Sequence, residues 1–321
     1  MVVDAHLHLN YRGLTPERLV AYLDREGIEQ GWTLTWEELQ PSRNEVLALP
    51  VEEVLAAHAR YPTRIIPFYA PDPRRPDAAA RLTELHEKGI RGCGELKVTL
   101  RWDEAPVGEL LRAAESLNMP VVFHMEEARS AYAPISDSRV ERWIAKALNS
   151  DRFLGLPRRG VTTLQFIHPG WRRRIAEMQY RFPGYLLDFA ALEERLREFP
   201  RLRFVGHGPG FWKGISGRAA NERGTHPRTR VAPGGIVDRL LSEYDNLFAD
   251  LSGRSGYNAL ARDLRHARQF LERHDRKLLF GTDNFALGLR RLIGTVELPA
   301  DRLTRIMGTN AHEVLTGVRR D

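Results

Sequence analysis

The sequence predicts an α/β protein whose strands close into a parallel (β/α)8 barrel. Apolar, strand-like runs alternate eight times with segments of helical periodicity along 321 residues. Side chains of metal-ligand type end five of these runs, and the C-terminal strand ends of such a barrel meet at one rim. The single cysteine, Cys93, excludes an internal disulfide framework, and no apolar run approaches the roughly 18 residues of a membrane span.

The first strand is predicted over residues 1–8, which form an apolar run ending in His-x-His. Since successive strand side chains alternate between faces, His6 and His8 should point to the same side, with Asp4 one step deeper. The following helix, predicted over 15–26, begins with a Thr-Pro pair suited to an N-cap and first turn and ends before a glycine.

The same criteria predict the remaining elements. Strands are expected over 31–35, 64–70, 90–98, 119–124, 202–207, 246–251 and 277–283, and helices over 51–60, 76–88, 106–117, 189–198, 235–243, 257–274 and 299–316. The gap after the fifth strand is far longer than one helix, so residues 125–185 are predicted to be an arginine-rich insertion within one domain of residues 1–321. The stretch 162–168 could form a ninth strand, but we assign it to the insertion. Residues 208–235 lack periodicity and are expected to form a long loop after the sixth strand.

Charge and composition restrict the class of partner. The net charge is +6 and the pI about 9.6, and only five of the 48 basic residues are lysines. Arginine binds carboxylate and phosphate groups bidentately, so the insertion and the long loop are expected to form a lid that recognises an anionic small-molecule substrate; a solvated charged face is the alternative. Acidic residues are interleaved with the basic ones, which argues against nucleic acid. We expect a cytoplasmic protein without an export signal, able to form homo-oligomers.

A metal site is predicted where the strand ends meet. Imidazole and carboxylate ligands suit a borderline divalent ion such as zinc, present as one or two ions. The candidate ligands are His6, His8, Glu95, His124, His207 and Asp283. Asp283 can also accept a proton, and His207 can act as a ligand or as an acid/base. Asp4 is expected to be a buried hydrogen-bond acceptor behind the ligands.

Several further residues have two interpretations each. Lys97 shares strand parity with Glu95, so it either pairs with that carboxylate or contacts the substrate. Trp212 follows the sixth strand and is either lid packing or a substrate wall. His168 lies in the insertion and is either a substrate contact or a structural histidine. Asp250 and Ser252 are expected to support Asp283 or the substrate.

The motifs together resemble the amidohydrolase superfamily. They are the opening His-x-His, the histidines ending the fifth and sixth strands, Gly281-Thr282-Asp283, and Gly308-Thr309-Asn310-Ala311. The resemblance is closest to amidohydrolase family 2, which includes metal-dependent hydrolases and some non-oxidative decarboxylases. It covers both ends of the chain and most strands, but omits residues 125–185.

The resemblance implies a TIM barrel in which His6, His8, His124 and Asp283 hold a first metal, with His207 as ligand or acid/base. On the fourth strand some members use a carboxylated lysine that bridges two metals, whereas TatD-type nucleases use a glutamate. This chain offers both Glu95 and Lys97. We favour Glu95 as the ligand, which leaves one or two metals open.

Four functions follow as hypotheses. The first is a metal-dependent hydrolase of a small C–N or C–O bond, and the second a metal-dependent decarboxylase on the same scaffold. The third is a TatD-type phosphodiesterase, supported by Glu95 and the basic charge. The fourth is a non-catalytic binding protein, which a complete ligand set disfavours.

Overall fold

The computed structural model describes residues 1–39, 49–149, 161, 163, 168–284 and 288–318. They divide into two compact units. The first contains the described residues up to Glu126 and from Tyr185 onwards, and the second those between Glu127 and Gly184.

Eight parallel strands of the first unit form the barrel. The first sheet contains β1 (Val3–Leu7), β2 (Gln30–Trp36) and β3 (Ile65–Ala70), and the second contains β4 (Cys93–Leu96), β5 (Val121–His124), β8 (Phe204–His207), β9 (Leu247–Asp250) and β10 (Leu278–Leu279). Two seams join the sheets: a bridge pairs Phe68 with Gly92, and the Ala5 amide donates to the Phe280 carbonyl at 2.9 Å. The predicted (β/α)8 barrel is therefore confirmed.

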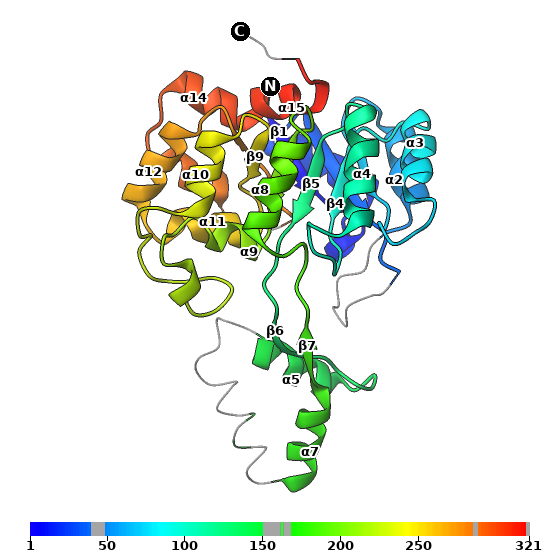
Figure 1. Ribbon diagram of the computed structural model, residues 1–321, viewed down its shortest axis with the longest axis vertical. Coiled ribbons are helices and arrows are strands. Elements are labelled where there is room, and N and C mark those ends of the chain that lie inside the picture. The colour runs from blue at the N-terminus through cyan, green and yellow to red at the C-terminus, as the bar shows by residue number, and fades with distance from the viewer. Residues whose placement is uncertain (40–48, 150–160, 162, 164–167, 285–287, 319–321) are drawn as a thin grey trace. The chain divides into compact units, whose positions relative to one another are not determined.

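Helices follow the strands and surround them (Figure 1). Those of the first unit are η1 (Tyr11–Gly13), α1 (Pro16–Glu26), α2 (Val51–Arg60), α3 (Ala78–Glu87), α4 (Ala105–Ser116), α8 (Phe189–Glu198), α9 (Pro209–Lys213), η2 (Ala219–Asn221), α10 (Ile236–Glu243), α11 (Gly253–Ala261), α12 (Leu264–Arg273), α13 (Leu289–Thr295), α14 (Ala300–Thr304), η3 (Arg305–Thr309) and α15 (Asn310–Thr316). Helix α1 has the predicted ends: the Thr15 side chain accepts from the Arg18 amide, and Gly27 stops the helix at φ 61°.

Three predicted elements were wrong in detail. The single helix over 257–274 is two helices, α11 and α12, because the Asp263 side chain accepts from the His266 amide and starts a new helix. The loop 208–235 contains the short helices α9 and η2, and α9 begins with a proline at its first position. The last strand ends at Leu279 rather than Asp283.

The barrel interior is filled by apolar side chains from its strands and from α15. The buried cluster consists of Val3, Ala5, Trp32, Leu34, Ile66, Phe68, Val122, Val205, Leu279, Ala311 and Val314. Gly308 lets η3 approach the start of the chain, because an added Cβ would lie 2.2 Å from the Met1 carbonyl oxygen. Strands and C-terminal helix thus share one core.

The second unit has its own small core. It contains β6 (Arg129–Tyr132) paired antiparallel with β7 (Gln179–Phe182), and the helices α5 (Arg139–Asn149) and α7 (Pro169–Met178). Its buried cluster is Ile144, Ala145, Ala147, Val161, Ile175 and Met178. This unit overlaps the predicted insertion 125–185, whose role as a lid stays a prediction. Residues 162 and 164–167 of the alternative ninth strand lie outside the described residues. Among the described helices, none has the length and apolar character needed to span a bilayer.

Candidate metal centre

His6 near the end of β1 and His8 directly after β1 point to the same side, as predicted. The Nδ1 atom of His8 lies 2.9 Å from the Leu34 carbonyl oxygen, and Nδ1 of His6 lies 2.6 Å from Asp250 Oδ2. Each Nδ1 faces an oxygen acceptor and therefore carries the hydrogen, which leaves a lone pair on each Nε2. These Nε2 atoms lie 3.2 Å apart. Two lone pairs so close together fit a shared cation, since two nitrogens bound to tetrahedral zinc are about 3.3 Å apart.

Two carboxylates complete the donor set around these nitrogens. Glu95 Oε2 lies 3.6 Å from His8 Nε2 and 3.9 Å from His6 Nε2. Asp283 Oδ1 lies 3.4 Å from His8 Nε2. Burial by itself would raise the pKa of Glu95, but the charges of Lys97 and His124 hold that pKa well below its usual value. The four donors come from β1, β4 and the turn after β10, and they suit a divalent ion.

His207 is held beside this set by Asp250 and Ser252. Its Nδ1 lies 3.2 Å from Asp250 Oδ2 and 3.1 Å from Ser252 Oγ, and the Ser252 hydroxyl donates to the same Asp250 oxygen. The rings of His6 and His207 are 4.2 Å apart. Burial lowers the pKa of His207, but the hydrogen bond to Asp250 and the nearby carboxylates outweigh it and raise the pKa to about 9.

His124 joins the cluster through Glu95. Its Nδ1 lies 2.6 Å from Glu95 Oε1, while its Nε2 lies 3.4 Å from Glu126 Oε2 and is buried without a hydrogen bond among the described residues. Ligand atoms of Glu95, His124 and His207 lie within 4.8 Å of one another, as do those of two further groups, His6–His8–Asp283 and His6–His207–Asp250. The structure thus brings all six predicted ligands to one rim, where one or two ions fit.

A second layer of hydrogen bonds fixes the seam between β1 and the turn after β10. The buried Asp4 carboxylate accepts from the Thr282 amide at 2.9 Å and hydroxyl at 2.7 Å, and burial raises its pKa to about 7. Asn284 clamps His8 by accepting from its amide at 2.8 Å and donating to its carbonyl at 2.6 Å. Asp4 is therefore the hydrogen-bond acceptor that we predicted.

Lys97 lies in an aromatic cage at the same rim. Its Nζ is 4.8 Å from the ring centroid of Trp36 and 5.6 Å from that of Tyr185. Burial lowers the pKa of this amine, but the charge of Glu95 raises it above the usual value. Within the described residues Nζ donates no hydrogen bond, so a charged, nearly buried ammonium is available to an anion.

Two other predicted contacts lie elsewhere. Trp212 is buried, and its Nε1 donates to the Asp250 carbonyl at 2.9 Å, which favours packing over a substrate wall. His168 is exposed at the N-terminus of α7 in the second unit, and its substrate role stays a prediction.

Sequence reasoning missed the partners of Asp250. We expected this carboxylate to support Asp283 or the substrate, but it contacts His6 and His207. The roles of Asn284, Glu126 and the Trp36–Tyr185 cage were also missed. The only available signal was proximity in sequence, since Asn284 directly follows Asp283 and Glu126 lies two residues after His124.

The fold and donor set define a TIM-barrel protein with a rim suited to a divalent metal. The family model described as amidohydrolase, Amidohydro_2, matches residues 3–316. The chain belongs to this family, and the resemblance that the motifs suggested is confirmed. No curated protein matches the chain significantly.

Solved structures share the fold at low sequence identity. A probable 2-pyrone-4,6-dicarboxylic acid hydrolase from Acinetobacter baumannii, with citric acid bound, has a TM-score of 0.55 and 14% identity, with 98% of each chain covered. A 5-carboxyvanillate decarboxylase from Sphingomonas paucimobilis gives the same values. A 5-carboxyvanillate decarboxylase from Novosphingobium aromaticivorans, complexed with manganese and 4-hydroxy-3-methoxy-5-nitrobenzoic acid, has a TM-score of 0.51 and 15% identity, covering 93% of this chain and 79% of that one.

Proposed function

We propose that this protein is a metal-dependent hydrolase that cleaves a C–N or C–O bond in a small carboxylated substrate. The observation that carries the proposal is the convergence of His6 Nε2, His8 Nε2, Glu95 Oε2 and Asp283 Oδ1, with measured separations of 3.2–3.9 Å. Like charges and facing lone pairs in a buried site are unfavourable unless a cation neutralises them.

These four residues would hold the ion, with His124 and His207 available to complete its shell or to hold a second ion. We predict zinc, and one structural neighbour, described as complexed with manganese, supports manganese as the alternative. A divalent ion supplies Lewis acidity, which activates water and polarises a carbonyl group.

The chain's own residues would supply proton transfer. Asp283 is placed to accept a proton from the attacking water, because its carboxylate lies at the ligand cluster on the turn after β10. His207 is tied to Asp250 and Ser252 through Nδ1, which leaves Nε2 to donate a proton to the leaving group. Metal content by elemental analysis tests the donor set directly.

The substrate carboxylate is assigned to Lys97. A Lys97→Met variant is expected to keep its metal content and to lower kcat/KM for a carboxylated substrate by roughly tenfold or more, because a charge-assisted contact is lost. The uncharged methyl ester of the same substrate is the control, and it should react equally with both proteins. An equal loss for acid and ester would remove the carboxylate assignment.

A panel of carboxylated lactones, esters and amides in H₂¹⁸O tests the reaction class. Hydrolysis incorporates one ¹⁸O atom into the product and releases no CO₂. Full activity after exhaustive metal removal would contradict the proposed metal dependence of the reaction.

Decarboxylation is the second candidate, favoured by the same caged ammonium. Lys97 can hold a carboxylate at the rim, and that group would be a spectator in hydrolysis but the leaving group in decarboxylation. Several structural neighbours are named as decarboxylases of carboxylated phenols. Release of ¹³CO₂ from ¹³C-carboxyl benzoates, with no ¹⁸O in the remaining product, would select this reaction.

A further inference from the structure

A cavity lies at the opposite end of the barrel from the candidate metal centre. It has a volume of about 350 Å³, within the range of small-molecule pockets. Its lining residues Arg203, Asn246 and Lys277 directly precede β8, β9 and β10, whereas His207 and Asp250 end β8 and β9. β8 and β9 each have four residues, and a strand rises about 3.3 Å per residue, so the two sites are roughly 13 Å apart.

The cavity is basic. Four cationic side chains line it, against the two carboxylates of Asp245 and Glu313; the cations are Arg201, Arg203, Arg276 and Lys277. The Asp245 side chain is 96% exposed and lies 3.7 Å from Lys277, so water screens most of its charge.

Three of these cations are held by other groups of the fold, and one is available. Arg203 donates to Val314 and Asn118, and Lys277 donates to the carbonyls of Tyr244 and Asp245. These residues shape the wall.

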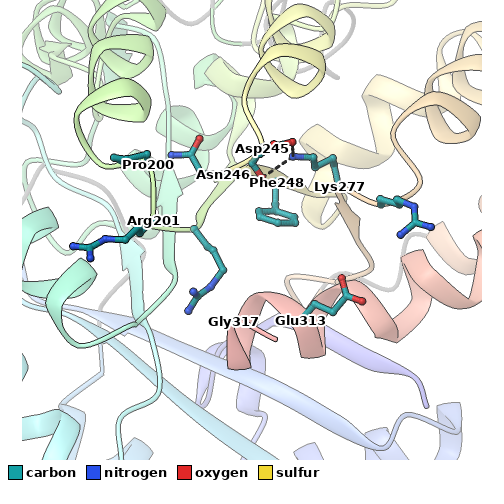
Figure 2. Close-up of a pocket in the computed structure, with 10 residues that line it drawn as sticks. Pro200, Arg201, Asp245, Asn246, Phe248, Lys277, Glu313 and Gly317 are labelled. Carbon is teal, nitrogen blue, oxygen red and sulfur yellow. Dashed lines mark hydrogen bonds and ion pairs between the residues drawn. The ribbon is translucent and has the colours of Figure 1, made fainter. Parts of the chain in front are cut away.

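By contrast, Arg276 is exposed and has no hydrogen bond or ion pair within the described part of the chain. Arg201 is instead paired with Glu115 at 3.4 Å, and in Figure 2 its guanidinium points away from Phe248. Arg276 is therefore the available cation, and a guanidinium group without a carboxylate partner can bind an anion bidentately.

The floor of the cavity is an aromatic ring. Figure 2 shows Phe248 in the middle of the lining side chains, with Glu313 and Gly317 on the helix below it. The ring is only partly buried, although it packs against the barrel core, and the Lys277 ammonium lies 5.2 Å from its centroid. The exposed part of the ring is an apolar surface that a flat group can contact.

We propose that this cavity is a second ligand site, for a small aromatic carboxylate. The ligand's ring would stack on Phe248, and its carboxylate would bind Arg276. A ligand there touches α15 and the segments that precede three strands, so its binding would stabilise the folded barrel. The site is independent of the proposed reaction, because none of its residues lies at the metal rim.

Phthalate is the probe, measured with the full-length protein by calorimetry and thermal unfolding after chelation. Phthalate should bind and raise the Tm. Arg276→Gln should weaken binding roughly tenfold, the effect of losing one charge-assisted contact. Phe248→Leu should weaken it as well. Arg91→Gln is the matched control: it removes an exposed arginine that, among the described residues, has no side-chain partner, and it should leave the affinity unchanged.

Two further measurements distinguish this site from binding at the metal rim and from unspecific anion binding: one uses the Lys97→Met variant, and the other uses inorganic phosphate. Lys97→Met should leave phthalate affinity unchanged, and inorganic phosphate should bind more weakly than phthalate. The proposal is overturned by absent binding, by an affinity indifferent to Arg276→Gln, by loss of binding in Lys97→Met, or by equal binding of phosphate. Because Arg276 is exposed, its variant is expected to fold even where Phe248→Leu does not.

Discussion

Asp250 orients two imidazoles with a single oxygen. Its Oδ2 lies 2.6 Å from His6 Nδ1 and 3.2 Å from His207 Nδ1. Burial by itself would raise the pKa of Asp250, but the charge of His6 and the hydrogen bonds of both histidines hold the pKa below its usual range. A carboxylate in this position fixes the tautomer and orientation of its histidine ligands.

Asp250→Asn is therefore expected to reduce metal affinity by roughly 10- to 100-fold. Competition with a chromophoric chelator measures the affinity. Asp238→Asn is the matched control, because Asp238 also pairs with a histidine, His274, away from the rim. Equal metal affinities in Asp250→Asn and wild type would show that Asp250 does not orient the ligands.

At this scale, strand parity was the most productive signal in the sequence. Alternation of side chains placed His6 and His8 on one face and placed Glu95 toward the rim. Parity contains no information about the register between strands, however, so it could not show that Asp250 meets His6 across 244 positions of sequence. The cage of Lys97 was equally inaccessible, because Trp36 and Tyr185 come from distant segments.

Among the elements, the turn after β10 contains a glycine, Gly281, at a place where β1, β9 and β10 end close together. An added Cβ at Gly281 would lie 2.8 Å from Asp250 Oδ1 and 3.2 Å from His6 Cβ. Gly281→Ala should therefore displace the Asp250–His6 pair, lower metal affinity at least tenfold and destabilise the fold by about 1–3 kcal/mol. Metal titration and urea unfolding measure the two effects.

Gly294→Ala in α13 serves as the control, because nothing lies within 4 Å of its added Cβ. If Gly281→Ala binds metal like the wild type, the strand end has more room than the geometry indicates.

Helices α8 and α10 are joined by an acid-sensitive contact. Glu193 accepts from Arg239 at 2.6 Å and from the Tyr244 hydroxyl at 2.8 Å, and these bonds lower its pKa to about 2. Because the pKa of Glu193 is depressed, the contact stabilises the fold fully at pH values above the ordinary pKa of 4.5. This contribution is lost as the pH falls toward 2.

Glu193→Gln should thus be less stable than the wild type at pH 7, and the difference should shrink between pH 4.5 and 2. Urea unfolding at pH 7, 4 and 3 tests this. Glu194→Gln, an exposed neighbour without a partner among the described residues, should show no such trend. A difference that does not vary with pH would assign the effect to packing instead.

Element boundaries were predictable where a cap was present in the sequence. Thr15, Pro16 and Gly27 mark both ends of α1. The break between α11 and α12 had a comparable signal in Asp263, but the apolar periodicity continues across it and concealed the new cap. The short helix α9 was missed because five residues are too few to show a period.

For the whole molecule, a bound ion would connect three segments of the barrel. The donors lie on β1, on β4 and after β10, so the ion would bridge both seams between the sheets. Chelation should lower the Tm by on the order of 5–10 °C, because ligand binding to the folded state alone stabilises it. Re-addition of Zn²⁺ should restore the Tm.

The double variant His6→Ala, His8→Ala is the control, and a chelator should not change its Tm. A drop of the same size in that variant would show that the chelator acts elsewhere.

At this scale the alternation of strands and helices sufficed to predict the closed barrel. It did not predict the paired strands β6 and β7, or the separate small core to which α5 and α7 contribute. Local patterns specify elements, whereas a second core depends on contacts between them.

The seam between β1 and the turn after β10 has a consequence for biosynthesis. His8 and Asp283, whose donor atoms lie 3.4 Å apart, are separated by most of the polypeptide. A chain emerging from the ribosome therefore carries the first two donors long before the last one exists. A complete donor set for an ion would exist only after translation has passed residue 283, so a nascent fragment would be a poor competitor for a divalent metal.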